Sequence, residues 1–84
     1  MSVPAQGDLR GIVPDAAAKV AELIGRRADA AALAGAIDAV AAHVAPDTHA
    51  GQEITFDFRQ AGDDLLIEAH CDGRSSEVRC PLAA

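Results

Sequence analysis

The chain is poor in aromatic residues: its 84 residues include two phenylalanines and neither tryptophan nor tyrosine. Aromatic rings bury more area than aliphatic side chains, so Ala, Val, Leu and Ile must supply the core. A domain of this length buries only about 60–65% of the surface that its unfolded chain exposes. We therefore expect one domain of marginal stability, which association with itself or with a protein partner would stabilise.

Positive charge is scarce as well, since seven Lys and Arg face thirteen Asp and Glu, for a net charge of −6. This balance argues against binding to nucleic acid or to an anionic membrane, both of which need a basic surface. No apolar run approaches the roughly 20 residues that span a bilayer. Residues 1–10 lack the basic and apolar regions of a secretory signal. We expect a cytoplasmic protein whose two cysteines are reduced.

Residues 52–71 have the alternation of a β-hairpin. The first strand places Ile54, Phe56 and Phe58 on one face, and the return strand does the same with Leu65, Ile67, Ala69 and Cys71. Gln60–Asp64 has the glycine and aspartates of a hairpin loop. A turn over 72–76 then leads to a third strand, Glu77–Leu82, which Pro81 assigns to a sheet edge because proline cannot donate a ladder hydrogen bond.

The N-terminal half predicts two helices. Pro14 and Asp15 begin the first, over about 14–27, and its expected apolar stripe is Ala17, Val20, Leu23 and Ile24. Asp29 is an N-cap candidate for the second, over about 30–44, and Pro46 forbids its continuation. The whole pattern predicts an α+β fold over residues 1–84, with two helices packed on a three-stranded antiparallel sheet in two layers, in the order α-α-β-β-β. Residues 1–8 are expected to form a flexible tail.

Residues 33–74 resemble part of the histidine-kinase-type (GHKL) ATPase fold, as it occurs in anti-sigma-factor kinases. In that family a helix that ends near a histidine leads through a loop into a hairpin, and the hairpin ends in an acidic–glycine motif. The matching text here is IDAVAAHV at 37–44, EITFDFR at 53–59 and LLIEAHCDGR at 65–74. The resemblance implies a nucleotide-binding framework in bacterial signalling.

The residues that give this family its chemistry are missing from the matching positions. The family uses a helix asparagine as a ligand to the nucleotide's magnesium, whereas this chain has no asparagine and offers Gly35, Ala39 and Ala42 instead. The aspartate that reads adenine aligns with Cys71, and shifting the alignment to Asp72 displaces the following glycine. The resemblance therefore implies a degenerate scaffold that binds no cofactor and has no catalytic residues.

Two groups of side chains are potential metal ligands, but neither predicts a site. Adjacent strand residues such as His70 and Cys71 lie on opposite faces, which is poor geometry for one ion. Nothing matches the spacing of a calcium-binding loop. The calcium group is Asp57, Asp63 and Asp64, and the zinc group is His43, His49, His70, Cys71 and Cys80. The cysteines are interpreted as small buried residues that neighbouring strands could bring close enough to oxidise to a disulfide.

We expect a non-catalytic regulatory module that acts through protein–protein interaction, as a homodimer or on a protein partner. Its expected contacts are the second helix and the edge of the third strand. The predicted partner-binding residues are Leu33, Ile37, Val40, Val44, Val78, Cys80 and Leu82. Two alternatives are a nucleotide-binding regulator or kinase-like protein of the anti-sigma type, and a small phosphotransfer protein that uses His43.

Overall fold

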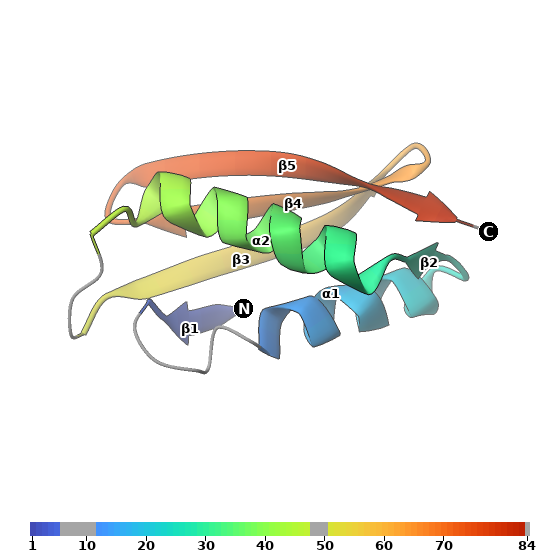
Figure 1. Ribbon diagram of the computed structural model, residues 1–84, viewed down its shortest axis with the longest axis horizontal. Helices are drawn as coiled ribbons and strands as arrows, with labels where there is room; N and C mark the ends of the chain where they lie inside the picture. The colour runs from blue at the N-terminus through green and yellow to red at the C-terminus, as the bar shows by residue number, and fades with distance from the viewer. Residues whose placement is uncertain (6–11, 48–50, 84) are drawn as a thin grey trace.

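The computed structural model describes residues 1–5, 12–47 and 51–83. Two helices cover one face of a curled five-stranded antiparallel sheet whose strand order is β1-β3-β4-β5-β2 (Figure 1). The α+β class is confirmed, whereas the predicted three strands are five. The elements are β1 (Ser2–Pro4), α1 (Ile12–Leu23), β2 (Arg27–Ala28), α2 (Ala30–Val44), β3 (Glu53–Ala61), β4 (Asp64–Cys71) and β5 (Arg74–Ala83).

The two additional strands, β1 and β2, are too short for a pattern to predict. β1 pairs with β3, where Val3 lies opposite Ile54 and is only 2% exposed. The start of the predicted tail is therefore part of the sheet, and residues 6–8 lie outside the described ranges. β2 pairs with the end of β5, with Ala28 opposite Leu82. A segment of two or three residues is too short to show the alternation of a strand. β1 and β2 are therefore strands only because they pair with segments far away in the chain.

Two-residue turns connect β3 to β4 and β4 to β5. Gly62 occupies the first turn at a φ of 61°, and Asp72 and Gly73 occupy the second at 49° and 81°. Positive φ at both central residues, as at Asp72 and Gly73, is typical of the type I′ turn, and positive φ at the first central residue alone, as at Gly62, is typical of type II′. Both turn types match the twist of the flanking strands. The predicted loops thus shorten to two residues each, and the last strand begins at Arg74 instead of Glu77.

The helices differ in how well their apolar stripes predict the buried face. α2 has the predicted bounds, and the Asp29 carboxylate caps it by accepting from the Ala32 N–H at 2.9 Å. α1 begins at Ile12 and ends at Leu23, short of the predicted Arg27. Its buried residues are Val13, Ala17 and Ala21, and Leu23 is 85% exposed. Of the predicted stripe, Ala17 is buried and Val20 is partly buried against the core, whereas Leu23 and Ile24 are exposed. The sheet and α2 thus contact a face of mostly small residues on α1.

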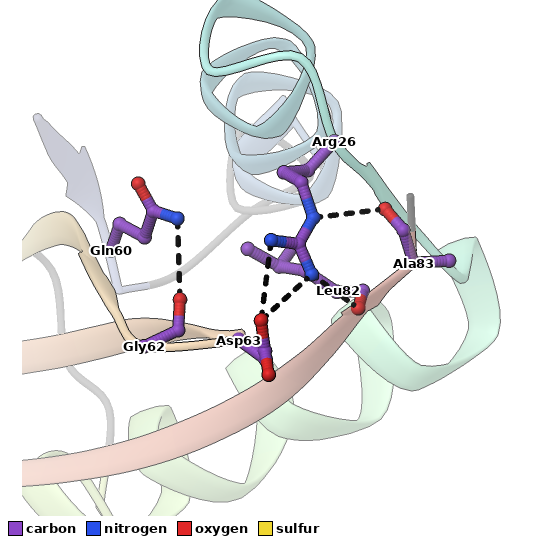
Figure 2. A network of polar contacts seen from close by, with 6 residues as sticks. All are labelled: Arg26, Gln60, Gly62, Asp63, Leu82 and Ala83. Atoms are coloured by element: carbon purple, nitrogen blue, oxygen red, sulfur yellow. Dashed lines mark hydrogen bonds and ion pairs between the residues drawn. The ribbon is translucent and has the colours of Figure 1, made fainter.

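Arg26 joins three segments where β5 ends (Figure 2). Its guanidinium donates to the carbonyl oxygens of Leu82 at 3.1 Å and Ala83 at 3.2 Å, and to Asp63 Oδ1 in the β3–β4 turn at 3.3 Å. A planar guanidinium has enough donors for all three acceptors. This contact holds the end of β5 next to the β3–β4 turn and the segment that leads into β2.

Candidate functional site

The predicted partner-binding residues lie mostly in the chain's own core. The α2 residues Leu33, Ile37, Val40 and Val44 are at most 2% exposed, Cys80 and Leu82 of β5 are 1% and 8% exposed, and Val78 is half-buried. Apart from the half-buried Val78, these side chains pack between helices and sheet, so they are not available to a partner. An apolar stripe indicates burial, and in so small a domain its own sheet buries it. A partner has to contact other surfaces.

One such surface is the outer edge of β5. In a two-residue hairpin the two residues that flank the turn, here Cys71 and Arg74, form a hydrogen-bonded pair. From Arg74 onward, the backbone N–H and C=O groups of every second residue of β5 therefore bond to β4. The N–H of Leu82 fits this series, since it bonds to the Asp63 carbonyl at 2.9 Å. The backbone groups of Ser75, Glu77 and Arg79 therefore point outward. Within the described residues, β2 pairs with this edge only at Leu82 and Ala83.

Pro81 lies on the same outer edge, where its missing N–H costs no bond to β4. The prediction that this strand lies at an edge thus holds over most of its length. It fails at the C-terminal end, which β2 covers. The described part of the chain leaves the backbone of 75–81 without a neighbouring strand on that side.

The side of α2 next to this edge carries small residues. His43 Nδ1 lies 3.4 Å from Ser76 Oγ, which places His43 on the side of α2 that faces β5. Ala39, Ala36 and Ala32 precede it by four, seven and eleven residues and so share that side. Ala32 and Ala39 are exposed and Ala36 is half-buried. Small side chains allow another backbone to approach closely.

A second cluster lies on the sheet face opposite the helices. Asp57, Glu68 and Glu77 are direct neighbours in the register of β3, β4 and β5. His70 Nε2 lies 2.6 Å from Glu68 Oε1 and 3.6 Å from Asp57 Oδ2. The alternation in β4 predicts that Glu68 and His70 share a face. Their contact with Asp57, however, depends on the register between β3 and β4, which cannot be derived from the sequence pattern. Sequence reasoning therefore missed this cluster.

The potential metal ligands considered from the sequence are dispersed in the structure. Asp63 contacts Arg26, and Asp64 contacts Arg79 at 3.8 Å, both away from Asp57. His70 and Cys71 do lie on opposite faces, because Cys71 is 3% exposed and faces the helices. His49 lies outside the described residues.

Cys71 and Cys80 are too far apart to form a disulfide. Cys71 lies opposite Arg74, whereas Cys80 lies opposite Leu65, six residues along β4. That offset corresponds to about 20 Å, well beyond the Cα separation of a disulfide. The expected proximity is therefore wrong. Burial raises the pKa of both thiols, and the Asp72 charge raises that of Cys71 further.

The acidic–glycine motif, Asp72-Gly73, is the tight turn between β4 and β5. Gln52 Nε2 donates to Asp72 Oδ2 at 3.0 Å, so the carboxylate is engaged within the chain. The two residues are thus explained by turn chemistry. The other positions of the resemblance, Gly35, Ala39 and Ala42, are exposed on α2.

Among the described residues, no helix has the length and apolar character needed to cross a membrane. Comparison with family models, with curated proteins and with solved structures finds no match for this chain. The likeness to the histidine-kinase-type ATPase fold stays a prediction from the residues.

Proposed function

We propose that the protein is a non-catalytic interaction module that works as a homodimer, formed by antiparallel pairing of two β5 edges. The observation that carries this proposal is the pair of opposite charges at Glu77 and Arg79, on an edge whose backbone groups point outward. An unpaired edge strand is a template for pairing with another chain. The exposed ends of Glu77 and Arg79 lie on the same sheet face.

The charges select one register for two-fold pairing. Because the outward backbone groups alternate, the symmetric registers centred near Glu77 place it opposite Glu77, Arg79, Pro81 or Ser75 of the second copy. The first juxtaposes like charges, the third places Arg79 opposite Arg79, and the fourth forms no ion pair. In the second, Glu77 of each copy faces Arg79 of the other, and Val78 faces Val78 across the two-fold axis. Both ion pairs then form, beside backbone hydrogen bonds from the same residues.

The same pairing places the two α2 helices side by side on the covered face of the joined sheet. The flank of each α2 next to β5 is alanine-rich at Ala32, Ala36 and Ala39. Two such flanks can approach closely and bury the exposed alanine methyl groups. Association also adds buried area to a core that holds a single fully buried aromatic side chain, Phe56, among the described residues.

Charge reversal tests the register. Static light scattering of the full chain should give twice the 8.6 kDa chain mass. Glu77→Arg and Arg79→Glu should each weaken the dimer roughly tenfold or more, because each converts two opposite-charge pairs into like-charge pairs. The double variant Glu77→Arg/Arg79→Glu should restore the dimer, since the pairs re-form with their signs exchanged. Glu22→Arg, an equal charge change on the exposed side of α1, serves as the control.

Unfolding does not explain the expected loss for Glu77→Arg, because Glu77 lies opposite Glu68 within the chain and its reversal removes a like-charge contact. Ala39→Arg tests the helix flank separately, since the position is exposed and arginine is a good helix former. It should remove the dimer without lowering the free energy of unfolding of the single chain. A monomeric wild-type chain, or a double variant that stays monomeric, would contradict the proposal.

A further inference from the structure

We propose that Asp57, Glu68 and His70 form a binding site for a divalent transition-metal ion, with Zn²⁺ as the simplest probe. The three residues come from two strands of the hairpin. Asp57 of β3 lies opposite Glu68 of β4, and His70 follows Glu68 by two residues and so shares its face. The inference is separate from the dimer, because none of its three residues contributes to the outer edge of β5.

The spacing of the three donor atoms fits one ion. Zn²⁺ bonds to nitrogen and oxygen ligands at about 2.0–2.1 Å, so tetrahedral ligand atoms lie about 3.3 Å apart. Here the separations from His70 Nε2 are 2.6 Å and 3.6 Å, and all three ligand atoms lie within 4.8 Å of one another. Small rotations of partly exposed side chains bring them to ligand distance.

The kind of donor decides which ion is favoured. The site offers one imidazole nitrogen and two carboxylate oxygens. Mg²⁺ and Ca²⁺ prefer sites made of oxygen ligands alone, whereas an imidazole favours Zn²⁺ and its neighbours in the first transition row. The histidine thus distinguishes this cluster from an ordinary acidic patch.

The charges around the site favour the binding of a cation. Asp57 and Glu68 are carboxylates placed directly opposite each other on β3 and β4, an arrangement that destabilises a sheet. Among the described residues, the contacts of Asp57 and Glu68 with a basic side chain are those with His70. Arg79, on the same face, is paired with Asp64. A bound divalent ion would offset this repulsion between the strands.

The site is also accessible to solvent, and its three protein ligands would not occupy every coordination position of a bound ion. His70 borders a surface depression of about 390 Å³, whose other lining residues include Thr55, Arg74 and Ser75. Three protein ligands leave at least one coordination position of the ion open, as in zinc sites that hold a water or an exogenous ligand. We therefore expect water or a small anion to complete the coordination.

Isothermal titration of the full chain with Zn²⁺ tests the site, together with Co²⁺ substitution to record its visible ligand-field spectrum. One ion per chain should bind, with a Co²⁺ spectrum typical of nitrogen and oxygen ligands without sulfur. His70→Gln, Asp57→Asn and Glu68→Gln should each weaken Zn²⁺ binding by at least about tenfold, since even the loss of an outer-shell partner has an effect of this size. The matched controls are His43→Gln and Glu22→Gln, which change the same residue types on exposed helix positions.

Circular dichroism checks that each variant is folded, and the two carboxylate variants should keep the fold because they reduce like-charge repulsion. Absence of Zn²⁺ binding would show that the cluster is only a contact between an imidazole and two carboxylates, and it would overturn the proposal. Binding that survives His70→Gln, or a Co²⁺ spectrum with thiolate character, would overturn it as well, because the ion would then lie elsewhere.

Discussion

Cys71 and Cys80 show how the surroundings of a single residue determine its chemistry. Both side chains are at most 3% exposed and lie among the apolar residues between sheet and helices. Burial disfavours the thiolate and raises the pKa of each thiol above the ordinary value of 9.0. Because the thiolate is the reactive form, these thiols should react slowly in the folded protein.

The raised thiol pKa values make the stability of the fold depend on pH in the alkaline range. The unfolded thiols lose their protons near the ordinary pKa, whereas the folded thiols keep them to higher pH. Their contribution to stability is thus fully present below about pH 9 and is lost as the pH rises through the raised values. Urea unfolding at pH 7–10 should show a steeper decline for the native chain than for Cys71→Ala/Cys80→Ala. Parallel curves would contradict this reasoning, since the two proteins differ only in the two thiols.

At the scale of the element, α1 and α2 differ in what determines their buried face. α2 carries branched residues at helical spacing, and that stripe is the buried one. In α1 the sheet and α2 leave room for small residues, so Val13, Ala17 and Ala21 are buried while Leu23 and Ile24 remain exposed. The packing partner, rather than the largest side chains, selects the contact face.

Two leucine substitutions test this difference. Leu23→Gln should change the free energy of unfolding by no more than about 0.5 kcal/mol, because its side chain is 85% exposed. Leu33→Ala should cost about 2–5 kcal/mol, because a fully buried leucine leaves a cavity. Chemical denaturation followed by circular dichroism measures both. A loss of several kcal/mol for Leu23→Gln would show that the end of α1 is buried in solution, for instance against a second copy.

At the scale of the whole molecule, the sheet is held together by contacts between segments far apart in the chain. β1 completes one side of the sheet and β2 the other, and Arg26 joins the end of β5 to the β3–β4 turn (Figure 2). The Asp63 side chain is 91% exposed, so its ion pair with Arg26 is screened by water. The two carbonyl bonds of Arg26 should therefore matter more than the ion pair.

Arg26→Met and Asp63→Asn separate these two contributions. Arg26→Met keeps most of the aliphatic stem but leaves the Leu82 and Ala83 carbonyls without this donor, and it should cost about 1–3 kcal/mol. Asp63→Asn should cost less than about 1 kcal/mol. Thermal unfolding of the two variants measures the difference. An equal loss for both would show that the ion pair, not the carbonyl bonds, holds the end of β5.

The sequence by itself determined the α+β class, the bounds of α2 with its Asp29 cap, and the hairpin with its alternating faces. These features depend on residues close together in the chain, whose spacing carries the periods of helix and strand. Tertiary structure alone decided that Ser2–Pro4 and Arg27–Ala28 are strands, that Leu23 is exposed, and that the two cysteines lie apart. It also decided that Asp57, Glu68 and His70 meet, because strand register and helix rotation follow from contacts between distant segments, which no local pattern records.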